Sequence, residues 1–164
     1  RYLLFFLLSA VGFAYTPTAE YQKSDVHGWR VLVDPDLVAH ESYAAVMKEL
    51  DVQLFLIGRR LPPSAVCELR KVPIWMELDV SQPLCMAYHP LGTDWLALNQ
   101  LNPDKQGAVD TGSAARFLEW TQQQPWMVLH ELAHAFHDRL PKGFENPVVL
   151  GAFEHARDSG LYES

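Results

Sequence analysis

Apolar residues recur along this chain at two spacings, and each spacing predicts a different element. Over residues 37–60 they recur every three or four positions, which predicts a long amphipathic helix whose apolar face packs on a sheet. Short β-branched and aromatic runs bounded by proline, glycine or aspartate predict strands at residues 29–33, 72–78, 84–88 and 107–111. Shorter helices are expected at residues 62–71, 114–120 and 147–157.

The order of these elements predicts an α+β fold in which a long helix backs a small mixed sheet. With 164 residues, of which 49% are hydrophobic, the chain can bury one core, so we expect one domain over residues 25–164. The 13 basic and 20 acidic residues give a net charge of −7, which argues against a nucleic-acid-binding surface, because phosphate contacts need a basic face. The sequence also contains no basic amphipathic helix that would bind a membrane surface.

The first fourteen residues have a pattern of their own, since Arg1 precedes a continuous apolar run that ends in small residues. This run is too short to span a membrane and has the length of a signal-peptide core. We therefore expect residues 1–14 to be an export signal and the mature protein to be periplasmic or extracellular, with no stable membrane association after cleavage. An N-terminal core helix or strand is the alternative. Because the chain starts with Arg1 and not with Met, we expect its natural start to lie upstream.

Cys67 and Cys85 are the two cysteines of the sequence. In an exported protein they could form a disulfide that closes a loop of about 18 residues and stabilises the fold by about 3 kcal/mol. Two separate buried thiols are the alternative, since neither cysteine has the CxxC spacing of a redox or metal site.

The strongest chemical signal is the run His130-Glu131-Leu132-Ala133-His134, which has the HExxH spacing of zinc hydrolases. On a helix, two residues four positions apart share a face, so both imidazoles can bind one metal ion. Glu131 lies beside the pair, where its carboxylate can take a proton from zinc-activated water. We therefore predict zinc as the cofactor, His130 and His134 as metal ligands, and Glu131 as the catalytic base.

The residues around this run predict the helix that the chemistry requires. Pro125 is tolerated in a first helical turn and Pro141 ends the segment, so we expect a helix over residues 125–139. The interval between the two prolines is strongly apolar, and a buried helix must supply polar partners for three polar side chains. A half-exposed helix whose histidines are only hydrogen-bonded is the alternative.

Four segments, at residues 72–78, 85–90, 124–138 and 159–164, resemble an uncharacterised family of exported bacterial zincin-like metallopeptidases. The resemblance extends over most of the chain from about Gly28. That family is in turn distantly similar to the catalytic domain of anthrax lethal factor. The resemblance implies a zincin-like fold in which strands and a long helix come first and a short edge strand precedes the HExxH helix.

The resemblance also implies a third zinc ligand, a glutamate that follows an Asn-x-x spacing on a later helix. No such segment is present up to Ser164, so we expect the third ligand to lie beyond this residue. Within the chain, Glu154 and His155 are the alternative, because a catalytic zinc site needs three protein ligands. His137 and Glu145 are weaker candidates.

Other polar and aromatic residues have structural interpretations. His89 could line a substrate cleft, although a hydrogen-bonded structural role is favoured. Asp138 could orient a zinc-bound imidazole, but a solvated helix end is the favoured interpretation. Packing in the core or on a strand face is expected of four tryptophans, namely Trp75, Trp95, Trp120 and Trp126.

Together these features predict an exported zinc metallopeptidase of gluzincin type that hydrolyses peptide bonds. A peptide or protein substrate would add to the sheet as an extended strand, with residues 107–111 as the predicted edge. The rival hypothesis is a metal-bound binding or scaffold protein of the same fold without catalysis. A zinc with an open water position would favour the enzyme, and a closed fourth ligand would favour the rival.

Overall fold

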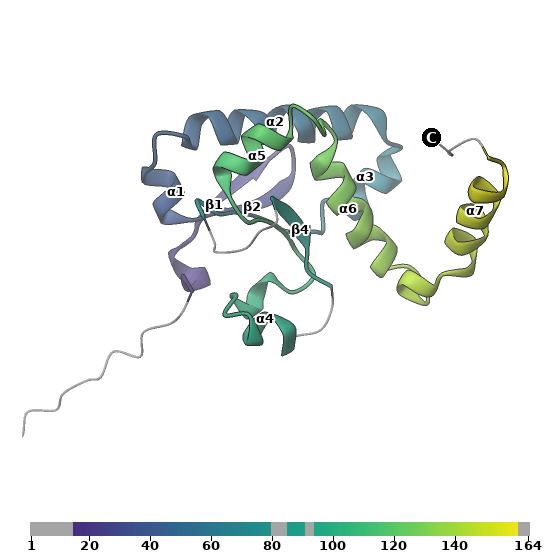
Figure 1. Ribbon diagram of the computed structural model, residues 1–164. Coiled ribbons are helices and arrows are strands. Elements are labelled where there is room, and N and C mark those ends of the chain that lie inside the picture. The colour runs from purple at the N-terminus through teal and green to yellow at the C-terminus, as the bar shows by residue number, and fades with distance from the viewer. Residues whose placement is uncertain (1–14, 80–84, 91–93, 161–164) are drawn as a thin grey trace, which may run out of the picture.

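The structure is a computed structural model in which residues 15–79, 85–90 and 94–160 are described. These residues form a mixed α+β fold with one five-stranded sheet and seven α-helices, so the predicted fold class is confirmed at this level (Figure 1). The strands are β1 (Gln22–Val26), β2 (Trp29–Val33), β3 (Ile74–Met76), β4 (Met86–Tyr88) and β5 (Val109–Thr111). The α-helices are α1 (Pro35–Ala39), α2 (Tyr43–Arg60), α3 (Pro63–Leu69), α4 (Asp94–Leu98), α5 (Ala114–Trp120), α6 (Met127–Asp138) and α7 (Pro147–Asp158). Three short 3-10 helices complete the description: η1 (Thr18–Glu20), η2 (Pro103–Lys105) and η3 (Gly143–Glu145).

The sheet has the order β1-β2-β3-β5-β4, and each edge strand runs antiparallel to its neighbour. The three central strands, β2, β3 and β5, are parallel to one another. Strand β4 pairs with β5 so that Met86 lies opposite Thr111 and Tyr88 lies opposite Val109. The prediction that residues 107–111 form the edge is therefore wrong, because β4 covers that side of β5 and is itself the edge strand.

The main core lies between one face of the sheet and the helices that cover it, chiefly α2, α3, α5 and α6 (Figure 1). Leu50, Leu54 and Ile57 of α2 are fully buried in one cluster with Val31 and Ile74 of the sheet. Burial of such a side chain stabilises the fold by about 1.5–3 kcal/mol relative to its exposure. The apolar face of this helix therefore lies on the sheet, as predicted. The opposite face of the sheet carries a smaller cluster that consists of Tyr21, Leu32, Trp75 and Ala108.

The helix predicted over residues 37–60 is two helices, α1 and α2, separated at residues 40–42. At the break, Nδ1 of His40 lies 2.8 Å from Oγ of Ser42 and accepts a hydrogen bond from the Ser42 N–H at 3.2 Å. Side chains that bond nearby backbone groups compete with the helical hydrogen bonds, and apolar periodicity does not detect them. The other predicted helices and strands are present with bounds that differ by a few residues.

Cys67 and Cys85 are free thiols, so of the two alternatives left open by the sequence the structure has the separate thiols and not the disulfide. Cys67 is exposed on α3, whereas Cys85 is buried with its Sγ 3.2 Å from Sδ of Met127. Of the two separate thiols, only Cys85 is therefore buried as predicted. Burial raises the pKa of the Cys85 thiol to about 11.

Four tryptophans are expected to pack in the core or on a strand face, and of these only Trp75 is buried. Trp95, Trp120 and Trp126 are 52%, 45% and 38% exposed, so the prediction is wrong for these three. Trp126 directly precedes α6, and the guanidinium of Arg60 lies 5.9 Å from its ring centroid. Such a cation–π contact suits an indole that is partly in water.

The predicted export signal, residues 1–14, lies outside the described residues. Among the helices that are described, none is both long enough and apolar enough to cross a membrane. The longest of them, α2, spans 18 residues and includes Lys48, Glu49 and Asp51.

Candidate metal centre

Helix α6 carries the HExxH residues and presents both histidines at the surface. Its buried side chains share one face, which packs the helix against the sheet, whereas Phe136 is 39% exposed on another side. The buried side chains are Met127, Val128, Leu132 and Ala135. The four-residue step from His130 to His134 places both imidazoles on the exposed side. The helix predicted over residues 125–139 is therefore confirmed, with slightly shorter ends.

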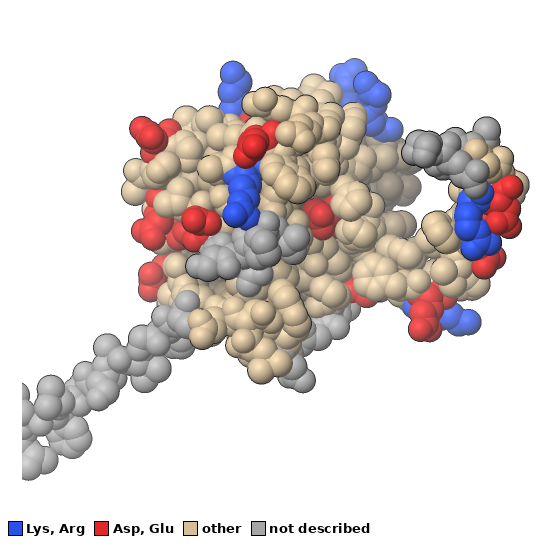
Figure 2. Space-filling view, viewed as in Figure 1, with Lys and Arg blue, Asp and Glu red and all other residues tan. Residues whose placement is uncertain are grey.

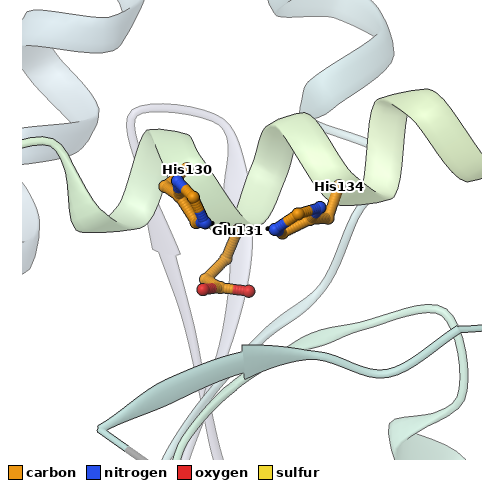
Figure 3. A group of neighbouring side chains, drawn as sticks. All are labelled: His130, Glu131 and His134. Carbon is orange, nitrogen blue, oxygen red and sulfur yellow. Dashed lines mark hydrogen bonds between the residues drawn. The ribbon is translucent and has the colours of Figure 1, made fainter. Parts of the chain in front are cut away.

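The two imidazoles converge from successive turns of the helix (Figure 3). Nε2 of His130 lies 3.1 Å from Nε2 of His134, with the ring planes at 84°. Two nitrogens bound tetrahedrally to one zinc ion at about 2.0–2.1 Å would lie about 3.3 Å apart. Without metal, the observed distance suits a hydrogen bond from one protonated Nε2 to the other, and zinc would replace that proton. The spacing of the two nitrogens therefore fits a shared zinc ion with little rearrangement.

Glu131 extends from the same helix toward strand β4 (Figure 3). Its Oε2 accepts a hydrogen bond from the backbone N–H of Tyr88 at 2.8 Å. Its Oε1 has no hydrogen-bond partner among the described residues. One carboxylate oxygen and one nitrogen from each histidine all lie within 4.8 Å of one another. A single water molecule can therefore bridge the carboxylate and an ion held by the histidines.

Among the described residues, no metal-binding side chain from outside the HExxH run lies close to both histidines. Glu154 and His155 are exposed on α7, and Figure 2 shows this helix standing off the body of the protein. Glu145 is also exposed. The ring of His137 packs against Phe144 with centroids 5.1 Å apart, and its buried Nε2 has no partner in the described part of the chain. None of these four sequence candidates is therefore brought to the pair.

Tyr88 makes a second contact with α6 through its side chain. Its hydroxyl donates a hydrogen bond to Oδ2 of Asp138 at 2.7 Å. Burial raises the pKa of Tyr88 above its ordinary value, and the bond to Asp138 raises it further, so the hydroxyl stays protonated. Asp138 is therefore more than a solvated helix end. Sequence patterns could not signal this contact, because the two residues are 50 positions apart.

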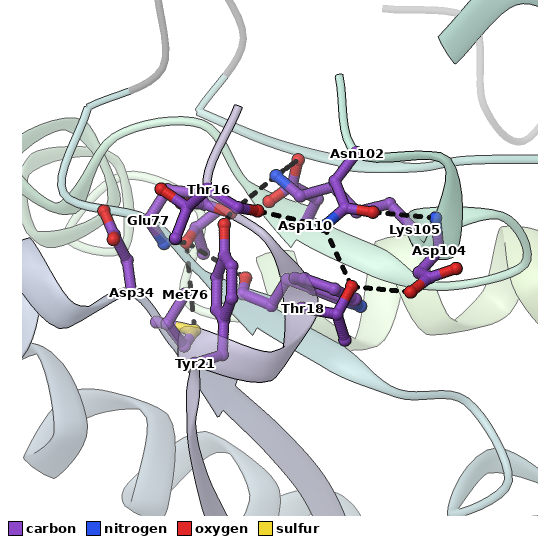
Figure 4. A network of polar contacts seen from close by, with 12 residues as sticks. Thr16, Thr18, Tyr21, Asp34, Met76, Glu77, Asn102, Asp104, Lys105 and Asp110 are labelled. Carbon is purple, nitrogen blue, oxygen red and sulfur yellow. Dashed lines mark hydrogen bonds and ion pairs between the residues drawn. The ribbon is translucent and has the colours of Figure 1, made fainter. Parts of the chain in front are cut away.

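A second cluster of titratable side chains, drawn in Figure 4, is buried beside Trp75, which belongs to the smaller apolar cluster on the face of the sheet opposite α6. Nζ of Lys105 lies 5.6 Å from the centroid of the Trp75 ring. Lys105 is 2% exposed, and its Nζ lies 2.5 Å from Oε1 of Glu77 and 2.9 Å from Oδ2 of Asp110. The same Asp110 oxygen lies 3.1 Å from Nε2 of His89, and Tyr21 donates to Glu77 at 2.8 Å. His89 is therefore a buried, hydrogen-bonded histidine, which confirms the favoured structural interpretation.

In this buried cluster one lysine lies between two carboxylates, and the pKa of both Glu77 and Lys105 is shifted. Burial raises the pKa of Glu77 to about 7, although the charge of Lys105 opposes the rise. Burial alone would lower the pKa of Lys105, but Asp110 and Glu77 outweigh it and raise the pKa above its ordinary value. Lys105 therefore stays charged, and the cluster contains its own cation.

The zincin-like resemblance rests on sequence segments alone, so comparison with known proteins is an independent test of it. The structure has the HExxH run on a helix and a short edge strand, β4, earlier in the chain, which are two features that the resemblance implies. Comparisons with protein-family models, with curated proteins and with solved structures gave no match, so the resemblance to the exported zincin-like family stays a prediction.

Proposed function

We propose that this protein is a zinc-dependent peptidase of zincin-like fold. The observation that carries the proposal is the convergence of the two histidine Nε2 atoms, 3.1 Å apart, with a carboxylate oxygen of Glu131 within 4.8 Å of histidine nitrogens. This set supplies two neutral zinc ligands and one base, which are the parts of a zinc hydrolase that HExxH provides. Strand β4 is a short edge strand that precedes α6 in the chain and bonds to it through Tyr88, and such a strand is what the zincin-like resemblance implies.

His130 and His134 would hold the zinc ion, and a third protein ligand would come from outside the described residues. Zinc, when bound, supplies a Lewis acid that polarises a carbonyl group and lowers the pKa of water. Both histidines are exposed, so water and a substrate can reach the position between them. The proposed centre is therefore accessible from solution.

A peptide substrate would lie as an added strand on β4. His89 exchanges backbone hydrogen bonds with the segment before β5, so by strand alternation the backbone groups of Met86 and Tyr88 face outward. Outward-facing groups of an edge strand are those that β-augmentation uses. The N–H of Tyr88 already donates to Glu131, so the added strand would meet the base at this position of β4. The scissile bond would therefore lie next to Tyr88.

In the proposed reaction, Glu131 accepts a proton from the attacking water. The water oxygen forms a bond to the peptide carbonyl carbon, and the C–N bond breaks as Glu131 passes the proton to the leaving nitrogen. One water molecule is consumed, and one carboxyl group and one amine are produced. No oxidant, reductant or further co-substrate is needed.

The cellular setting is part of the same proposal. The apolar residues 1–14 would direct the chain out of the cytoplasm, so the substrates would be exported or extracellular peptides and proteins. A non-catalytic metal-binding protein is the rival, and it would use the same histidines without turnover.

Replacing Glu131 separates metal binding from catalysis. In Glu131→Gln both histidines remain, so the zinc content should stay near that of the parent, while hydrolysis should fall by about 10²–10⁴-fold through loss of the base. Metal analysis and cleavage of unstructured fluorogenic peptides measure the two quantities. Glu119→Gln, on the exposed surface of α5, is the matched control and should keep the parental rate.

Two results would contradict the proposal in different ways. A parent that binds zinc but cleaves none of the peptides supports the non-catalytic rival. A Glu131→Gln protein that cleaves them at the parental rate shows that another group is the base.

A further inference from the structure

Tyr88 contacts helix α6 at two places through two different parts of the residue. Its backbone N–H donates to Oε2 of Glu131 at 2.8 Å, and its hydroxyl donates to Oδ2 of Asp138 at 2.7 Å. The residue is 8% exposed, so water competes little for either bond. Both acceptors are carboxylates, which form shorter and stronger hydrogen bonds than neutral acceptors.

The two acceptors lie on the same side of the helix. Asp138 lies seven positions after Glu131. On an α-helix this step is a rotation of two full turns minus about 20°, with a rise of about 10 Å along the axis. Tyr88 therefore contacts α6 at two heights along one line. Two contacts on one line fix both the position and the rotation of the helix relative to β4.

The first of these contacts holds the carboxylate beside the histidine pair. A glutamate side chain has three rotatable bonds, and an exposed one samples many conformations. Here Oε2 is held by the Tyr88 N–H, whereas Oε1 has no partner among the described residues. The carboxylate is thus oriented before any substrate arrives, with one oxygen left to take a proton.

We propose that Tyr88 is a positioning residue for Glu131. Its N–H holds the carboxylate, and the bond from its hydroxyl to Asp138 keeps that N–H in place. This inference rests on the proposed function, since the orientation of Glu131 matters for turnover only if Glu131 is the base. Tyr88 acts on the rate of the chemical step through Glu131 and not through contact with zinc.

Amide hydrogen exchange tests the contact without any measurement of hydrolysis. In the folded full-length protein, Glu131→Ala removes the acceptor, and we expect the amide of residue 88 to exchange at least about 10-fold faster. Tyr88→Phe keeps the N–H and loses the bond to Asp138, so a smaller increase of about 3-fold is expected. The amide of His89, which donates to the Ala108 carbonyl at 2.9 Å, is the internal reference and should not change. Unchanged exchange at residue 88 in Glu131→Ala would overturn the proposal.

Kinetics test the consequence for turnover. In zinc-loaded Tyr88→Phe we expect kcat to fall by about 10-fold, while KM and zinc affinity stay within about 2-fold of the parent. Tyr43→Phe is the matched control, because the Tyr43 hydroxyl accepts an exposed hydrogen bond from Gln22 at 3.2 Å. A merely structural Tyr88 would lower stability and leave kcat of the folded, zinc-loaded fraction unchanged. That result would overturn the positioning role.

The failures of the two proposals are distinguishable. If the zinc-loaded parent cleaves no peptide, the peptidase proposal fails and the positioning role falls with it, whatever the amide exchange shows. If the parent cleaves peptides and either the residue-88 exchange or kcat does not respond as stated, the positioning role alone is wrong.

Discussion

Two clusters of histidine and carboxylate side chains lie on opposite faces of the same sheet, and one of them contains its own cation. In the buried cluster, Lys105 pairs with both Glu77 and Asp110. In the cluster on α6, His130 and His134 are exposed, and among the described residues no lysine or arginine forms a salt bridge with Glu131. The first cluster is closed to solvent and supplied with positive charge, whereas the second is open to a cation from solution.

The difference indicates which cluster maintains the fold and which can act on a ligand. A buried carboxylate without a partner costs several kcal/mol, so a buried cluster must include its counter-charge to be stable. An exposed pair of imidazoles has no such requirement, because water solvates both rings. Accessible ligand atoms that converge without a resident cation are therefore the better candidate for a metal site.

The largest effect is expected where the buried cluster loses its cation. Lys105→Met leaves Glu77 and Asp110 buried without their shared partner, which should lower the free energy of unfolding by about 3–5 kcal/mol. Urea unfolding followed by circular dichroism measures the change. Zinc affinity of the fraction that stays folded should not change, since Lys105 lies on the opposite face of the sheet from α6.

An exposed lysine provides the control for that experiment. Lys71 pairs with Glu68 at the surface, and Lys71→Met should change the free energy of unfolding by less than about 1 kcal/mol. If Lys105→Met is no more destabilising than Lys71→Met, the buried cluster does not depend on its lysine, and the contrast between the two clusters is wrong.

The next effect is expected on the open side of the comparison. His134→Ala should lower zinc affinity by at least about 100-fold, since each ligand of a zinc site contributes several kcal/mol to binding. The stability of the zinc-free protein should change little, because the side chain is exposed. Isothermal titration calorimetry and thermal unfolding measure the two quantities. His155→Ala, on α7, should leave zinc affinity unchanged, and a loss there would show that His155 is a ligand after all.

The convergence of the α6 cluster could be predicted from the sequence because its parts are local. His130, Glu131 and His134 lie within five residues of one helix, where helical geometry alone sets their spacing. The buried cluster gave no comparable signal, since Tyr21 bonds to Glu77 across 56 positions. No periodicity in the chain reports such a pairing.

Strand neighbours were also beyond local prediction. Strands β3, β4 and β5 have three residues each, too few for alternation to indicate which of them lies at the edge. Strand β1 was missed because it is a polar, mostly exposed edge strand. It pairs with β2 through a turn in which His27 and Gly28 have φ of +52° and +87°, the positive values typical of type I′ hairpins.

The smallest effect is a pH dependence that should belong to the buried cluster alone. Burial raises the pKa of Glu77 from 4.5 to about 7, so the folded protein holds a proton there that the unfolded chain releases. A group with a raised folded pKa contributes stability that is complete below its unfolded pKa and is lost as pH rises through the folded value. As pH rises from about 4.5 to about 7, the ionisation of Glu77 should therefore lower the free energy of unfolding by on the order of 2 kcal/mol.

Glu77→Gln isolates this contribution, because the amide is neutral at every pH and keeps an acceptor for Tyr21 and Lys105. As pH falls from 7 to 4.5, the free energy of unfolding of the parent should rise relative to that of the variant. Taking this difference removes the similar slope of Asp34, whose pKa burial also raises. A difference that is flat with pH would mean that Glu77 stays ionised beside Lys105. The buried cluster would then carry a net negative charge, and its contrast with the α6 cluster would rest on access to solvent and not on charge balance.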